Sequence, residues 1–257
     1  MRARELSPSV AAGLRLFARY AYPPNERGSC GPEDHVQLLE YTTSGLADGG
    51  LAQLARTFTG PWPYLTLLAG AAGVDDPFEY DVVEAYWVGN PLLERVRTAD
   101  FGLTLEDRFK RQAGPSWGFL AEGVPEGAAC HHSFHVLGVY PWLGHLRRSG
   151  RQEPLEVLDR CRIRWGQVRS ASPGSAEVAS APLTWDGQRL GIGEPRSETV
   201  RCAVSDLVAG EWVALHWDWV CDRLTPRQLG HLRSYTGRQL AISNDGVAHS
   251  GPGMAMS

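Results

Sequence analysis

The sequence has little lysine and no excess of positive charge. Lys110 is the only lysine among its 25 basic residues, which indicates the coding bias of a GC-rich genome more than a binding surface. The formal net charge is -4 and the pI is near 6.1. No broad basic field is therefore available to hold a phosphate backbone, and we expect no nucleic-acid partner.

Long apolar runs are also missing. No stretch approaches the roughly 20 apolar residues that a membrane-spanning helix needs. The first ten residues, MRARELSPSV, lack the apolar core of a signal peptide. We therefore expect a cytoplasmic protein without membrane association.

Several signatures of nucleotide-dependent enzymes and hydrolases are absent as well. The sequence contains no glycine-rich phosphate loop, no GxSxG elbow, no paired Walker elements and no internal repeat. These absences disfavour an ATPase and a nucleotide-dependent dehydrogenase.

Cysteine is present but not in the pattern of a disulfide framework. The five cysteines, at positions 30, 130, 161, 202 and 221, are odd in number, widely spaced and without a CxxC pair. In a reducing compartment the thiols that matter are metal ligands or nucleophiles. The alternative for each of them is a buried thiol that packs as a small apolar residue.

The hydrophobic patterning predicts an α+β protein. Helical spacing of apolar residues, interrupted by prolines, dominates up to about residue 148, and alternating patterns with turn signals such as Asp186-Gly187 follow. The β-type pattern begins near Leu155, and Thr225-Pro226 starts a final helix. We predict a helical domain at 1–150, a small β-barrel domain with a terminal helix at 151–245, and a flexible tail at 246–257.

The second half contains a characteristic order of parts. Cys161 is followed by a Gly-Gln-Val triplet at 166–168, a strand ending in DLV, a Gly-Glu-Trp-Val segment at 210–213, and a strand with a central His216. This order resembles the HypC/HupF family of nickel-iron hydrogenase maturation chaperones over roughly residues 160 to 240. Two departures stand out: Trp165 replaces the family's proline, and about 160 residues precede a cysteine that in the family follows the initiator methionine. Over its whole length the chain also faintly resembles an uncharacterised actinobacterial family, from which no activity follows.

The resemblance implies a fold, a cargo and a partner. It implies an OB-like barrel that carries iron, with cyanide and carbonyl ligands, to the hydrogenase large subunit or to another maturation protein. Such an iron favours a soft thiolate donor, and a histidine can ligate the metal or hydrogen-bond the thiolate. Cys161 and His216 are therefore the first candidate site, and the alternative for Cys161 is a half-buried strand cysteine.

A second candidate site lies in the segment CHHSFH. It consists of Cys130, His131, His132 and His135. We predict one helix here that bends at Pro141. His131 and His135 would then be spaced i and i+4, and His132 and His135 i and i+3, so that two imidazoles could share a zinc, iron or copper ion. The alternative is a polar helix start that packs under aromatic neighbours.

A third candidate site combines Cys30 and His35. Cys30 precedes a predicted helix whose N-terminus favours a thiolate, and His35 lies one turn inside that helix. The pair could ligate a metal or act as a nucleophile with its base. The alternative is a shaped turn between two helices. Cys202 and Cys221 are expected in the barrel core.

The resemblance implies a hydrogenase accessory protein that binds or transfers the iron unit, or holds the immature large subunit, without turnover. Two alternatives remain open. One is a metal-dependent enzyme with its site at His131, His132 and His135, and the other is a scaffold whose cysteines are inert.

Overall fold

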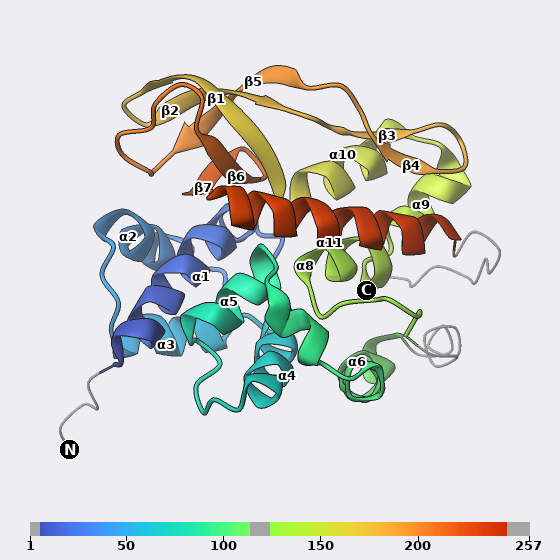
Figure 1. Cartoon of the computed structure of the whole chain (residues 1–257), viewed down its shortest axis with the longest axis horizontal. Coiled ribbons are helices and arrows are strands. Elements are labelled where there is room, and N and C mark those ends of the chain that lie inside the picture. The colour runs from blue at the N-terminus through green and yellow to red at the C-terminus, as the bar shows by residue number, and fades with distance from the viewer. Residues whose placement is uncertain (1–5, 114–123, 246–257) are drawn as a thin grey trace.

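The computed structural model describes residues 6–113 and 124–245 and has an α+β architecture (Figure 1). The helical elements are α1 (Pro8–Glu26), α2 (Val36–Ser44), α3 (Gly49–Arg56), α4 (Trp62–Ala72), α5 (Tyr80–Trp87), η1 (Pro91–Arg95), α6 (Thr98–Ala113), α8 (His132–Phe134), η3 (His135–Val139), α9 (Trp142–Ser149), α10 (Gln152–Cys161) and α11 (Pro226–Asp245). The strands are β1 (Arg164–Ser172), β2 (Ser175–Ser180), β3 (Leu183–Trp185), β4 (Leu190–Ile192), β5 (Arg196–Cys202), β6 (Trp212–His216) and β7 (Trp219–Arg223). A helical first part, a barrel and a terminal helix are therefore confirmed.

The long helix α1 organises the helical half. Ser7 caps it by accepting a hydrogen bond from the backbone N–H of Val10. Leu14 and Phe17 are fully buried, and the Phe17 ring lies 6.2 Å from that of Trp87 in α5, between centroids. Gly13 permits a close approach, because a Cβ at this position would lie 1.9 Å from the carbonyl oxygen of Phe78. Helix α1 also contacts β6 and β7, so it positions the barrel as well.

The barrel is closed in the order β1-β2-β5-β7-β6. Its strand pairs are antiparallel except β5 and β7, which are parallel. Valine and leucine side chains from these strands fill the interior. Gly166 fits only without a side chain, because a Cβ there would lie 2.3 Å from Cγ1 of Val178. The predicted Asp186-Gly187 turn joins β3 and β4, which form a separate hairpin.

The predicted β-type pattern from Leu155 is wrong at its start. Residues 152–161 form helix α10, and the first strand begins only at Arg164. The strand pattern rested on Leu155 and Val157, but Val157 is only half-buried, and the buried pair is Leu155 and Leu158, whose spacing of three matches one face of a helix. Cys161 therefore ends a helix instead of opening a strand.

The predicted single helix across CHHSFH is also wrong. The segment forms the short helix α8, the π-helical turn η3, and the separate helix α9. Tyr140 is extended, with ψ at 144°, because the residue before Pro141 is pushed out of the helical region. Its N–H donates to the carbonyl of His135 at 3.1 Å, the wide spacing of a π-turn.

One apolar core spans both halves. Barrel residues such as Ile163, Ala214 and Trp219 belong to the same buried cluster as the helices. Helix α11 runs between the barrel and the first helices (Figure 1). The domain division near residue 150 stays a prediction, and the predicted tail at 246–257 lies outside the described residues.

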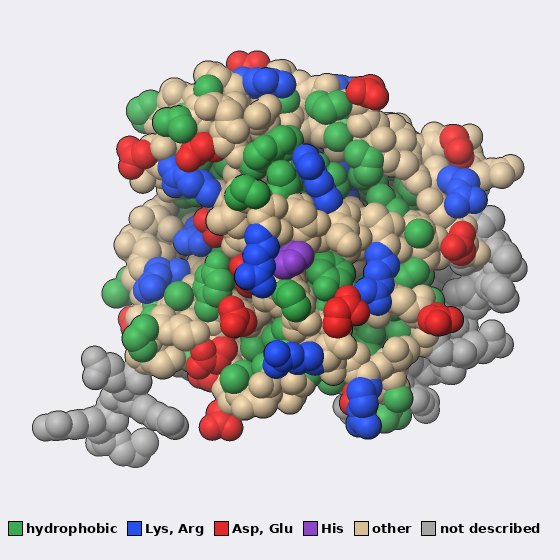
Figure 2. Space-filling view, viewed as in Figure 1, with side chains coloured by type: hydrophobic (Ala, Val, Ile, Leu, Met, Phe, Trp, Pro, Cys, Tyr) green, Lys and Arg blue, Asp and Glu red, His purple; other side chains and the backbone are tan. Residues whose placement is uncertain are grey.

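Basic and acidic side chains are interspersed on the face shown in Figure 2. No described helix combines the length and apolar character that crossing a membrane requires.

Candidate metal centre

Three side chains from distant parts of the chain meet in the interior. His132 comes from α8, Cys161 from the end of α10 and His216 from the end of β6. One ligand atom from each lies within 4.8 Å of the other two, and all three residues are buried. We call these residues the inner site. It unites Cys161 and His216 of the first candidate site with one histidine of the second.

His216 presents an unpartnered nitrogen to this site. Its Nδ1 lies 2.7 Å from the carbonyl oxygen of Tyr20. A carbonyl only accepts, so Nδ1 carries the proton and Nε2 carries a lone pair. Nε2 is buried and has no hydrogen-bond partner among the described residues. Orientation of a histidine by a backbone carbonyl is the usual arrangement behind a metal-ligating imidazole.

His132 is held between the other elements of the site. Its Nε2 donates to the carbonyl oxygen of Cys161 at 2.9 Å, and Nδ1 accepts from the Tyr86 hydroxyl at 3.2 Å. The Trp87 ring lies 4.7 Å from the His132 ring and 5.7 Å from the His216 ring, between centroids. Binding an ion through Nε2 requires the proton of His132 to move to Nδ1, where the Tyr86 oxygen can accept a hydrogen bond.

Burial keeps all three groups neutral. It raises the pKa of the Cys161 thiol to about 12, with a further contribution from the nearby Cys30. It lowers the pKa of His132 to about 4 and that of His216 well below its ordinary value. Neutral His216 can ligate through Nε2 as it stands, whereas His132 must first move its proton to Nδ1 and the thiol must lose its proton to a binding ion.

The chain holds Cys161 and His216 together through their neighbours. The backbone N–H of Trp217, next to His216, donates to the carbonyl of Arg160, next to Cys161, at 2.7 Å. Trp217 has a φ of 54°, an uncommon conformation for a large side chain. The strained backbone of Trp217 thus brings the end of α10 and the turn between β6 and β7 into contact.

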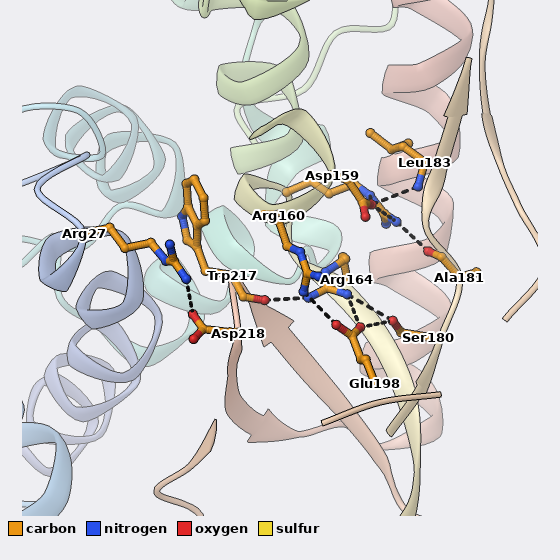
Figure 3. Close-up of polar contacts among 11 residues, drawn as sticks. Arg27, Asp159, Arg160, Arg164, Ser180, Ala181, Leu183, Glu198, Trp217 and Asp218 are labelled. Atoms are coloured by element: carbon orange, nitrogen blue, oxygen red, sulfur yellow. Dashed lines mark hydrogen bonds and ion pairs between the residues drawn. The ribbon is translucent and has the colours of Figure 1, made fainter. Parts of the chain in front are cut away.

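A buried ion-pair network fixes that turn (Figure 3). Arg164 is 2% exposed and donates to Glu198, to the Ser180 hydroxyl and to the carbonyl of Trp217. Burial alone would raise the pKa of Glu198, but Arg164, Ser180 and Arg160 lower it on balance. The carboxylate is therefore charged, and its ion pair with Arg164 links β5 to β1, the strand that follows Cys161.

The remaining members of the CHHSFH segment point elsewhere. The Cys130 thiol donates to the carbonyl of Tyr64 at 3.6 Å. His131 precedes the helix, caps it by accepting from the N–H of Ser133, and stacks on Tyr235. His131 and His135 therefore do not lie on one helical face as predicted, because α8 begins only at His132.

His135 lies beside the inner site. Its Nδ1 is 3.0 Å from the Tyr64 hydroxyl, and its ring stacks on that of His132 at 6.3 Å between centroids. Burial lowers its pKa to about 3.

The third candidate site differs from the prediction. His35 does not lie one turn inside a helix, because α2 begins only at Val36 and His35 is its N-cap residue without a side-chain capping bond, while Cys30 is half-buried. Neither belongs to a three-ligand group within the described ranges. Cys221 is buried in the core as expected, whereas Cys202 is half-buried and its thiol donates to the carbonyl of Val204.

The groups that surround the imidazoles were not among the predicted site residues. The Tyr86 hydroxyl, the Trp87 ring and the backbone carbonyl of Tyr20 orient them. A buried Tyr-Trp pair on a short helix is the weak signal that the sequence offers for the first two. The role of a backbone carbonyl leaves no sequence signal.

Comparisons with known proteins give one match. A family model described as "Family of unknown function (DUF6390)" matches residues 9–250. Comparison with curated proteins yields no match, and neither does comparison with solved structures.

Proposed function

The chain belongs to this family of unknown function, and we propose that it binds a metal ion at the inner site. The observation that carries the proposal is the buried, unpartnered Nε2 of His216 beside the Cys161 thiol and His132. An unpaired buried acceptor costs free energy in the absence of a ligand. A cation bound there would remove that cost.

The donor set fits a borderline or soft cation. One thiolate and two imidazoles suit zinc, iron(II), cobalt(II) or copper, and they do not suit magnesium or calcium, which prefer oxygen. Three protein ligands leave a fourth position for an exogenous ligand. The ion would supply charge to hold such a ligand, while the chain supplies orientation and excludes water.

We further propose iron as the cargo and hydrogenase maturation as the context. The two residues that the HypC/HupF resemblance pairs, Cys161 and His216, belong to one ligand group, which supports this narrower proposal. The five-stranded closed barrel with one parallel pair also supports an OB-like assignment. On this proposal the protein is cytoplasmic, and its partner is the hydrogenase large subunit or another maturation protein.

The helical half gives the proposal a feature that the small chaperones lack. Cys161 is 8% exposed and cannot extend into a partner's cavity. His132 supplies a ligand from the helical half in place of one from a partner. The helical half therefore encloses the bound iron and supplies one of its ligands.

A metal-dependent enzyme remains the second candidate because the fourth coordination position could take a substrate. The described part of the chain places no carboxylate in the ligand group that could serve as a general base. The scaffold alternative requires the inner site to bind nothing.

Cobalt(II) titration of the apoprotein without oxygen tests the metal site. Thiolate ligation to cobalt(II) produces charge-transfer absorption. We expect one ion per chain in the wild type, and at least about 100-fold weaker binding in Cys161→Ser. Cys202→Ser changes a half-buried barrel thiol outside the site and is the matched control. Wild-type binding that Cys161→Ser leaves unchanged would refute the site.

Infrared spectroscopy tests the cargo. The protein is purified without oxygen from a host that expresses the iron-cyanide assembly genes. Cyanide and carbonyl stretching bands in the wild type that vanish in Cys161→Ala would support the carrier. A folded wild type with cobalt affinity but without these bands would leave a metal protein of another class.

A further inference from the structure

Cys30 lies in a turn of fixed shape at the edge of the core. Asn25 is 2% exposed, and its side-chain amide donates to the carbonyls of Cys30 and Pro32, at 3.0 and 2.6 Å. Gly31 has a φ of 88°, and a Cβ there would lie 2.2 Å from the Phe58 ring. The turn therefore holds Cys30 in one place, half-buried, with its side chain packed against the core.

His135 faces the same point as this thiol. A Cβ placed on Gly60 would lie 3.6 Å from Nε2 of His135 and 3.8 Å from Sγ of Cys30, at ordinary contact distance from both. The absent side chain of Gly60 thus leaves a space bordered by a thiol and an imidazole.

This space connects with the inner site. The His135 ring stacks on that of His132 and lies 4.5 Å from that of Tyr140, between centroids. Burial raises the pKa of Tyr140, and the nearby thiols of Cys161 and Cys30 raise it further. A row of metal-binding groups leads from half-buried Cys30 through His135 to fully buried His132.

We propose that Cys30 and His135 form an outer, transient metal site that takes up a divalent cation of the zinc, cobalt or iron(II) class and passes it to the inner site. This inference rests on the proposed function of the inner site. The outer site solves a physical problem that burial creates. Moving a hydrated cation into an apolar interior costs much free energy unless protein ligands replace its water molecules one by one.

Each step is a ligand exchange without oxidation. Cys30 releases its thiol proton to solvent as its sulfur binds the ion. When the ion moves inward, the Cys161 thiol loses its proton, and the Cys30 thiolate takes up a proton as its bond to the ion breaks. The net result is one proton released for each ion bound.

Stopped-flow mixing of the apoprotein with cobalt(II) separates passage from final binding. We expect Cys30→Ser to slow the appearance of the final spectrum about tenfold or more, while the amount of cobalt bound at equilibrium stays that of the wild type. Gly60→Ala fills the space with a methyl group that the fold tolerates, and should also slow loading. Cys202→Ser and Gly70→Ala are the matched controls, since a Cβ on Gly70 meets nothing within 4 Å.

The outcomes distinguish this inference from the proposed function. Loading of Cys30→Ser at the rate of Cys202→Ser would overturn the outer site and leave the inner site intact. Loss of equilibrium binding in Cys30→Ser would overturn a transient role, because Cys30 would then be a permanent ligand. A wild type that binds no cobalt overturns both.

Discussion

Buried histidines should make the stability of this protein fall steeply in mild acid. Burial lowers the pKa of His131 to about 3, of His132 to about 4 and of His135 to about 3, and neighbouring His132 adds to the shift of the first and third. In the unfolded chain each would titrate near about 6.5. Between these values the unfolded state binds protons that the folded state does not. Stability is therefore complete above about pH 6.5 and is lost as the pH falls.

The size of the effect follows from these values. At pH 5 each of the three histidines has lowered the free energy of unfolding by about 2 kcal/mol, or by about 6 kcal/mol together. The slope of this free energy against pH approaches about 4 kcal/mol per pH unit. The free energy of unfolding of a typical domain is only about 5–15 kcal/mol in total. We expect the metal-free protein to unfold near pH 5, above the ordinary carboxylate pKa values of about 4.

Urea unfolding in the presence of a chelator, at several pH values from 7.5 to 5.5, measures this slope. His131→Asn keeps a residue that favours the N-cap position and removes one titrating group, so the slope at pH 5.5 should fall by about 1.2 kcal/mol per pH unit. His145→Asn is the control, because His145 is exposed on α9. A free energy of unfolding that stays constant over this range would refute the argument.

Three further predictions concern the metal and the packing. Cobalt(II) at about 100 times its dissociation constant should stabilise the wild type by about 2.7 kcal/mol in urea unfolding, and an equal gain in Cys161→Ser would contradict the site. Gly13→Ala should lower the free energy of unfolding by about 1–3 kcal/mol or more, because its methyl group collides with the carbonyl of Phe78; a melting temperature equal to that of the wild type would disprove this close approach. Arg164→Leu should cost about 1–3 kcal/mol in chemical unfolding, because it removes a buried guanidinium that pairs with half-buried Glu198 and bonds the carbonyl of Trp217, while Arg160 stays paired with Glu198. An unchanged free energy of unfolding would contradict a stabilising role of this network.

The barrel could be predicted from the sequence better than α10 and the CHHSFH segment, which supply Cys161 and His132 to the inner site. The Asp186-Gly187 turn and the strands that end in His216 follow from alternation and turn residues, which are local signals. Leu155 and Val157 alternate as in a strand, whereas Leu155 and Leu158 lie on one face of a helix, so the start of the barrel was misplaced. Over so few residues the local pattern could not decide between a strand and a helix.

The pairing of Cys161 with His216 was predicted from the order of parts, whereas the choice of His132 was not possible from spacing. Spacing on a continuous helix offered two pairs, His131 with His135 and His132 with His135. The extended Tyr140 before Pro141 and the late start of α8 turn His131 away and direct His132 inward. Such a break depends on packing against α10 and α11, which no local pattern contains.

The shared core has a consequence for folding cooperativity. Ile163 and Trp219 of the barrel pack in one cluster with the helices, and a bound ion would join His132 of the helical half to Cys161 and His216. If either half unfolds, the other half loses apolar contacts of the shared core and the ion loses at least one ligand. The ion would act as a thermodynamic link between the halves, so that loading the site converts two partly coupled units into a single melting transition.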